Sequence, residues 1–176
     1  AEAHRHLPGD ELVPAAGGTT RAITIDAPPA LVWPWLVQIG FGRAGWYSYD
    51  WIDNDGEPSA TVIRPDLQDL AVGDRIPMTP DMGFDVVSID PGRSLVSLSD
   101  DGSTSWCLLV ERDHEDRTRL ISRFRAVVQP SVLGIIWSVI TDPGAFVMER
   151  RMLKGIRRRA ESSASSPSSS SSPSAS

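Results

Sequence analysis

The sequence of 176 residues is poor in cysteine: it contains only Cys107, so no intrachain disulfide bond can form. Such low cysteine usage is typical of a reducing compartment. Long hydrophobic runs are also missing. The longest, at residues 132–140, spans about half of the ~20 residues that a membrane-crossing helix needs. We therefore expect a cytoplasmic protein, associated with a membrane only if the natural chain carries an anchor upstream of Ala1.

Positive charge is in short supply as well. The sequence has 17 Lys and Arg residues against 23 Asp and Glu residues, which gives a net charge of −6. This balance excludes a general nucleic-acid binder, because such a protein needs a surplus of cations to neutralise phosphates. Metal ligands are sparse too: the histidines do not converge, and a calcium-loop pattern at residues 51–62 lacks oxygen ligands at its first and last positions. We therefore expect neither a metal nor a cofactor.

The cations that are present concentrate near the C-terminal end, where residues 149–161 carry a local excess of positive charge. A charged helix face of this kind is usually just exposed to solvent. A second interpretation is weak contact with anionic lipid, with the apolar run at 132–140 alongside it. The residues that would make this contact are Arg150, Arg151, Lys154, Arg157 and Arg158.

Both ends of the chain differ in composition from its centre. Residues 162–176 are almost entirely Ser, Ala and Pro, and they cannot bury enough apolar surface to offset the entropy of ordering, so we expect a disordered tail. Residues 1–19, with LPGDELVP and a Gly-Gly pair, predict an extended lead-in outside the fold. Between the two ends, residues 20–161 form a single predicted domain.

Within this domain the patterns change along the chain. Residues 20–26 alternate in polarity as a half-buried strand does, with Arg21 on the same side as two isoleucines. Residues 27–39 predict a helix that opens on two prolines and is kinked or restarted at Pro34. A second short helical piece that carries several aromatic residues follows. After it we expect antiparallel strands joined by turns, near 61–64, 73–78, 84–90, 94–99, 105–111 and 118–127.

The last predicted element is a helix over residues 145–161, which contain no proline. Its apolar residues form one arc, and Arg and Lys fill the opposite face. Glu149 falls within the apolar arc, where a carboxylate is costly unless it is paired or protonated. Three interpretations stay open: a buried ion pair with Arg75, Arg123 or Arg125, a group that orients a ligand, and a general acid/base with a raised pKa.

Gly40, Gly42 and Gly45 match the G-x-G-x-x-G pattern of dinucleotide-binding loops. Such a loop leaves a strand, opens a helix and belongs to a βαβ unit, whereas here a helix precedes it and hairpins follow. We therefore reject a nucleotide site and interpret the glycines as a sharp turn. The rings that follow either pack the helices onto the sheet or line a ligand pocket. They are Trp46, Tyr47, Tyr49 and Trp51.

The order of a strand, two short helices, antiparallel strands and a long terminal helix resembles the START-like (SRPBCC) superfamily, also called the polyketide cyclase/dehydrase and lipid-transport group. The resemblance covers residues 20–161 and rests on ITIDAPPALVWPWL, LAVGDRIPM and FVMERRMLKGIRRRAE. GWYSYDW after the first helix looks most like small bacterial members. The resemblance implies an α+β helix-grip fold, in which a curved antiparallel sheet of about six to seven strands wraps the C-terminal helix and leaves a cavity.

The resemblance also implies a function, namely binding or transport of a small hydrophobic ligand of the lipid, polyketide or isoprenoid type. Two alternatives stay open because a fold does not fix a reaction. One is a polyketide cyclase, aromatase or dehydratase that uses Glu149 as its acid/base, and the other is a membrane-peripheral or structural partner. The ligand-binding residues that we expect are Trp46, Tyr47, Tyr49, Trp51, Met78, Trp106, Arg123, Glu149 and Met152.

Overall fold

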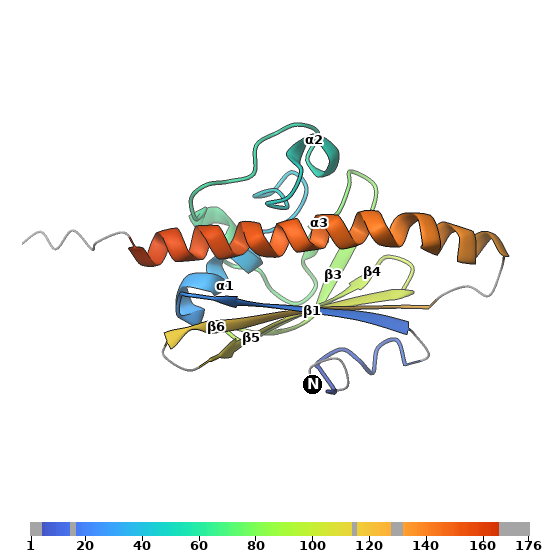
Figure 1. Cartoon of the computed structure of the whole chain (residues 1–176), viewed down its shortest axis with the longest axis horizontal. Helices are drawn as coiled ribbons and strands as arrows, with labels where there is room; N and C mark the ends of the chain where they lie inside the picture. Colours follow the sequence, from blue (N-terminus) through green and yellow to red (C-terminus); the bar gives the residue numbers. More distant parts are fainter. Residues whose placement is uncertain (1–4, 15–16, 114–115, 128–131, 166–176) are drawn as a thin grey trace, which may run out of the picture.

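The computed structural model describes residues 5–14, 17–113, 116–127 and 132–165 of the chain. In this part, six strands form one antiparallel sheet in the order β1-β6-β5-β4-β3-β2, and a helix of 34 residues lies across one face (Figure 1). The strands are β1 (Gly17–Ile25), β2 (Arg75–Pro77), β3 (Gly83–Asp90), β4 (Ser94–Ser99), β5 (Thr104–Arg112) and β6 (Thr118–Ala126). The helices are α1 (Pro29–Val37), α2 (Asp50–Asp53), the 3-10 turn η2 (Pro65–Leu67) and α3 (Val132–Ser165).

This arrangement is the α+β helix-grip fold that the sequence predicted. Each strand from β3 to β6 follows its neighbour directly, so the turns at residues 90–93 and 100–103 close hairpins. The first strand then pairs with the last, because β1 lies beside β6 over the full length of both. A register shift between Val86 and Ser88 interrupts the ladder of β3, and a bulge of this kind bends the strand and increases its twist.

One predicted strand is wrong. Residues 61–64 join no ladder and belong to the connection between α2 and β2. The Gln38 side chain holds this segment in place: its Nε2 donates to the carbonyl oxygen of Val62 (3.4 Å), and its Oε1 accepts from the backbone N–H of Arg64 (2.9 Å). The β-branched pattern predicted a strand, but a buried side-chain amide satisfies backbone groups that a partner strand would otherwise satisfy.

The helix boundaries also differ from the prediction. α1 runs through Pro34, where the helix loses one backbone hydrogen bond. α3 begins at Val132, well before the predicted start at residue 145. The apolar run at 132–140 therefore lies in the first part of α3, but its side chains fall outside the described residues, as do residues 166–176 of the predicted Ser-rich tail. No helix in the described ranges has an apolar stretch long enough to cross a bilayer.

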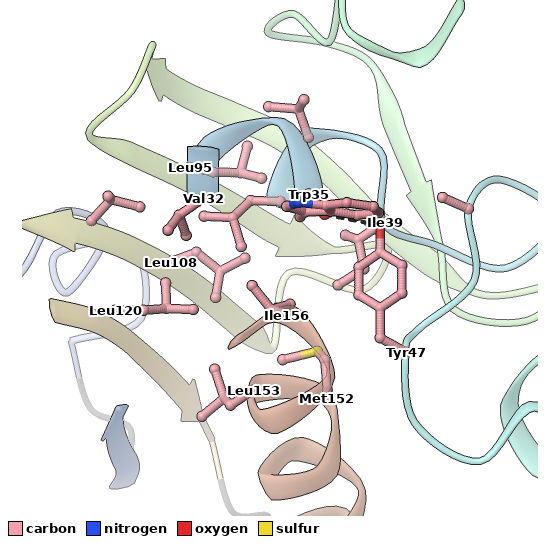
Figure 2. Close-up of a cluster of buried hydrophobic side chains, with 14 of the residues drawn as sticks. Val32, Trp35, Ile39, Tyr47, Leu95, Leu108, Leu120, Met152, Leu153 and Ile156 are labelled. Carbon is pink, nitrogen blue, oxygen red and sulfur yellow. Dashed lines mark hydrogen bonds between the residues drawn. The ribbon is translucent and has the colours of Figure 1, made fainter. Parts of the chain in front are cut away.

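The face of the sheet that α3 covers, here called the inner face, carries the main core. Side chains from α1, the central strands and α3 meet there and are almost completely buried (Figure 2). They include Val32, Trp35, Leu95, Leu108, Leu120, Met152, Leu153 and Ile156. Because strand residues alternate between the two faces, this core follows from the period-2 pattern of β4, β5 and β6.

A smaller core lies on the outer face, away from α3. It contains Leu7 together with apolar residues of β4, β5 and β6, among them the single cysteine, Cys107. Residues 5–14 run beneath this face (Figure 1), and Leu7 and Val13 are buried there. The prediction of a lead-in outside the fold is wrong for these residues, because their apolar side chains and Asp10 pack against the sheet.

On the side of α3 that faces away from the sheet, the connection between α1 and β2 holds the helix (Figure 1). The Arg151 Nε donates to the carbonyl oxygen of Ser48 (2.9 Å), and the Arg159 guanidinium lies 4.4 Å above the Tyr47 ring. The backbone of Tyr47 itself lies in the left-handed region, with a φ of 56°. Gly155 permits the close approach: a Cβ at this position would lie 2.3 Å from the Tyr47 carbonyl oxygen.

This contact gives a stability prediction with a matched control. Ala is favoured over Gly inside a helix by about 1 kcal/mol, so Gly144→Ala, where an added Cβ meets no atom within 4 Å, should leave stability unchanged or raise it. Gly155→Ala should instead destabilise the protein by about 1–3 kcal/mol, because the new methyl group collides with backbone. Urea denaturation measures both, and equal effects of the two substitutions would contradict the contact.

Candidate ligand-binding site

Glu149 lies on the face of α3 that turns toward the sheet and is 8% exposed. Both of its carboxylate oxygens are engaged: Oε1 accepts from the Ser122 hydroxyl (2.7 Å), and Oε2 accepts from the Arg21 guanidinium in a salt bridge. Burial raises the pKa of the Glu149 carboxyl, because the loss of hydration outweighs the hydrogen bond from Ser122 and the charge of Arg21. Glu149 is therefore a buried acid with a defined set of partners.

Sheet register places these partners. Arg21 of β1 lies directly opposite Ser122 of β6, and both side chains belong to the inner face. The Trp106 indole N–H, from β5, donates to the Ser122 hydroxyl (3.0 Å). A continuous polar chain thus runs from Trp106 through Ser122 and Glu149 to Arg21.

The predicted ion pair of Glu149 is present, but its partner was predicted wrongly. Arg123 is next to Ser122 and therefore points to the outer face, where it donates to Asp10 and to the carbonyl oxygen of Arg5 (2.6 Å each). Arg125 shares that face and donates to the backbone of Val13 and Pro14. Arg75 pairs with Asp100 near the other edge of the sheet. Arg123 is consequently separated from the other candidate ligand residues by the sheet itself.

An aromatic cluster, defined as Trp46, Phe84, Trp106 and Phe124, lies on the inner face beside this polar chain. The rings of Trp106 and Phe124 stack with centroids 5.1 Å apart. Trp46 and Phe84 approach Trp106 at 5.8 and 5.9 Å. Of the predicted ligand residues, Trp46, Trp106 and Glu149 are therefore brought into one region.

Several buried polar atoms in this region have no hydrogen-bond partner within the described part of the chain. They include Nε of Arg21, Nε1 of Trp46 and Oγ of Ser97. Ser97 lies opposite Trp106 in the register of β4 and β5, on the inner face. A buried polar group without a partner costs about 1–3 kcal/mol, so these atoms are places where a ligand could gain hydrogen bonds.

The remaining predicted site residues lie elsewhere. Tyr47 packs behind α3, where its hydroxyl donates to the carbonyl oxygen of Trp35 (3.1 Å) and accepts from Gln38 (2.9 Å), and burial raises the pKa of Tyr47 to about 12. The Tyr49 ring lies under Arg151. Trp51 is 75% exposed, and Met78 is also exposed. Met152 is buried in the packed core of Figure 2.

The hollows near these residues are open grooves. The first, here called the β1–α3 groove, has a volume of about 300 Å³ and is lined by Arg21 and its neighbours in β1 and by the middle of α3. A second groove of about 560 Å³ lies between Trp35, residues 61–63 and the C-terminal part of α3. Neither is the enclosed cavity expected from the sequence. The β1–α3 groove adjoins the site, because Arg21 lines it and also binds Glu149.

Arg21 and Ser122 were missed as site residues, although the sequence contains a signal for each. Arg21 shares the buried side of an alternating strand with Ile23 and Ile25, and an arginine in that position needs an acidic partner. Ser122 lies between Leu120 and Phe124 in the same inner-face alternation. The alternation within each strand indicates which side chains share a face, but it does not indicate which strands are neighbours in the sheet.

Comparisons with solved structures agree with the fold. The protein CV1439 from Chromobacterium violaceum superposes with a TM-score of 0.53 at 14% identity, over 82% of this chain and 98% of that one. The KanY protein superposes with a TM-score of 0.53 at 12% identity, over 83% and 98% of the two chains. The Polyketide_cyc-like protein Cgl2372 from Corynebacterium glutamicum is 20% identical over 85% and 90%, but its TM-score of 0.40 carries no argument. No family model and no curated protein sequence matches the chain. The likeness is therefore one of fold alone.

The raised pKa of Glu149 gives a pH prediction. A carboxyl with a higher pKa in the folded than in the unfolded protein contributes stability that is full below its unfolded pKa, near 4.5, and is lost as the pH rises through its folded pKa. Across that range, the unfolding free energy of wild type should fall relative to that of Glu149→Gln, as measured by urea denaturation. Glu57→Gln, at an exposed position, controls for the loss of one carboxylate. If the difference in unfolding free energy between wild type and Glu149→Gln stays constant over this pH range, or changes in favour of wild type, the pKa of Glu149 is not raised.

The buried ion pair predicts that removing Arg21 alone destabilises the protein more than removing Arg21 and Glu149 together. Arg21→Met leaves Glu149 buried without a counter-charge and should cost about 3–5 kcal/mol at neutral pH. Adding Glu149→Leu should restore most of this loss, because it removes the unpaired charge. As a control, Arg93→Met breaks an exposed pair with Asp90 and should cost at most about 1 kcal/mol. If Arg21→Met is as mild as Arg93→Met, the pair is not buried in solution.

Proposed function

We propose that this domain binds a small hydrophobic molecule beside the Arg21–Glu149 ion pair, and that the pair orients the polar group of the ligand. One observation carries the proposal: a buried carboxylate on α3 is paired with an arginine that also lines an apolar surface groove. If the ion pair served stability alone, its arginine would not need to line the β1–α3 groove.

The pair reaches from the interior to the surface. The Glu149 side chain is 7% exposed and the Arg21 side chain 20% exposed, so Arg21 is the more accessible end. A ligand in the β1–α3 groove would therefore meet the exposed part of the Arg21 side chain, while Glu149 holds the guanidinium from the interior side.

Apolar burial supplies the affinity in this proposal. Removing apolar surface from water contributes about 25 cal/mol per Å², before the cost of association is subtracted. The apolar residues that line the β1–α3 groove would supply this burial, and the aromatic cluster, whose rings are packed against one another, lies further inside. The polar groups then select the orientation of the ligand more than they add affinity.

The enzyme alternative meets an obstacle in the same contacts. The raised pKa of Glu149 suits a general acid/base. Both carboxylate oxygens, however, already accept hydrogen bonds from Ser122 and Arg21, so a substrate would have to displace one of them. These contacts favour a role in which Glu149 positions Arg21 over a role in which it transfers a proton.

A thermal-shift screen tests the proposal. With a library of lipids, polyketides and isoprenoids, at least one compound at about 100 times its Kd should raise the Tm by about 5–10 °C. The pair-replacement variant Arg21→Met/Glu149→Leu, which keeps the apolar surface, should bind the same compound with altered preference between analogues that differ in their polar group. A uniformly flat screen with wild type would contradict ligand binding.

A further inference from the structure

The β1–α3 groove combines an apolar floor with a cationic rim. The floor is built by two consecutive residues of the edge strand β1 and by one side of α3. It consists of Ala22, Ile23, Phe146 and Leu153. The three other lining residues are the cations Arg21, Arg150 and Lys154, and none of the described lining residues is acidic. This is the surface chemistry of a site for an amphiphile.

Two of the cations, Arg150 and Lys154, lie one turn apart on the same side of α3. Both are exposed, and neither forms an ion pair with any described residue. Like charges at this spacing repel each other along a helix. In a chain with a net charge of −6, where acidic partners abound, two neighbouring cations without an acidic partner favour binding of an anion.

Two other cations on α3, Arg151 and Arg157, are engaged within the fold. Arg151 donates to the Ser48 carbonyl oxygen and lies over the Tyr49 ring. Arg157 pairs with Glu161 and Asp26. The broad basic face predicted as a membrane contact is therefore partly used within the fold. Arg150 and Lys154 are its exposed cations at the β1–α3 groove, and Arg158 is an exposed cation outside that groove.

Arg21 is the third cation, and it forms the inner end of the groove. Its guanidinium carbon lies 4.7 Å from the centroid of the Phe146 ring, so the apolar floor and the cation are in direct contact. Because Glu149 already neutralises Arg21, the charge that remains for a ligand belongs to Arg150 and Lys154.

We propose that the β1–α3 groove binds a single-chain amphiphile with an anionic head group, of the fatty-acid carboxylate class. The acyl chain lies on the apolar floor, and the head group binds where Arg150 and Lys154 supply the net positive charge and Arg21, positioned by Glu149, orients it. A concave site of about 300 Å³ suits one chain, whereas a bilayer surface is flat. This inference rests on the proposed function and deepens it by naming the charge of the ligand and the place of its head group.

Dodecanoate and dodecanol, used below their aggregation limits, separate the head group from the chain. Isothermal titration calorimetry should give a dodecanoate Kd that is weakened at least about tenfold in Arg150→Glu/Lys154→Glu. Arg158→Glu reverses an exposed cation on the same helix outside this groove and should change the Kd by less than about twofold. Dodecanol should bind all three proteins alike, because it lacks the charge.

The other outcomes overturn the inference in distinguishable ways. If dodecanoate binding survives the double charge reversal, the head group lies elsewhere, and the proposed function still stands. If dodecanol weakens as much as dodecanoate, the reversal has damaged the site as a whole and the charge assignment fails. If neither compound binds wild type while phosphatidylglycerol vesicles do, the surface contacts membranes and the groove inference is wrong. If wild type binds none of them and the library screen is also flat, the proposed function fails as well.

Discussion

The buried ion pair between Arg21 and Glu149 is the interaction on which the rest of the site depends. It joins the first strand to the last helix through two residues that are 128 positions apart in the chain. The pair lies in an apolar interior, where either charge alone would be costly. The pair can form only if β1 lies beside β6, because Ser122 then completes the coordination of the carboxylate. The open edge of β1 in turn creates the groove in which Arg21 is accessible. In the proposed function, fold closure and ligand recognition use the same side chains.

The position of α3 is fixed from its other side by contacts with the connection between α1 and β2. Tyr47 and Ser48 approach the helix backbone so closely that Gly155 is needed at the crossing point. Two independent constraints therefore set the height of α3 above the sheet: the ion pair on the inner side and the Gly155 contact on the outer side. A helix held in this way keeps Glu149 against Arg21 of β1 and presents Arg150 and Lys154 to the groove.

The sequence predicted the layers of the fold better than the partners within the site. The period-2 alternation of β6 agrees with the structure, in which Leu120 and Phe124 lie on one face and Arg123 on the other, although Arg123 was predicted as a partner of Glu149. It could not show that residues 5–14 would cover the outer face and bind Arg123, nor that β1 would bring Arg21 to Glu149.

The TVI triplet at residues 61–63 has strand propensity, but none of the described strands pairs with it, and the Gln38 amide hydrogen-bonds to its backbone instead. The sequence analysis also missed that α3 begins at Val132 and continues through Pro143, because a proline inside a helical pattern usually ends the helix. Apart from this helix boundary, the wrong predictions concern which segments meet in space, and single-sequence patterns carry little information about that.

The most direct test of the account is to observe which protein protons touch a bound ligand. Isotope-filtered NOE spectroscopy on labelled protein, with the strongest binder from the library left unlabelled, reports these contacts without any substitution. The account predicts NOEs from the ligand chain to the ring of Phe146 and the methyl groups of Ile23 and Leu153, which form the floor beside Arg21. NOEs confined to the second groove, at Val62 and Ile63, would show that the ligand binds away from the ion pair and would contradict the central claim.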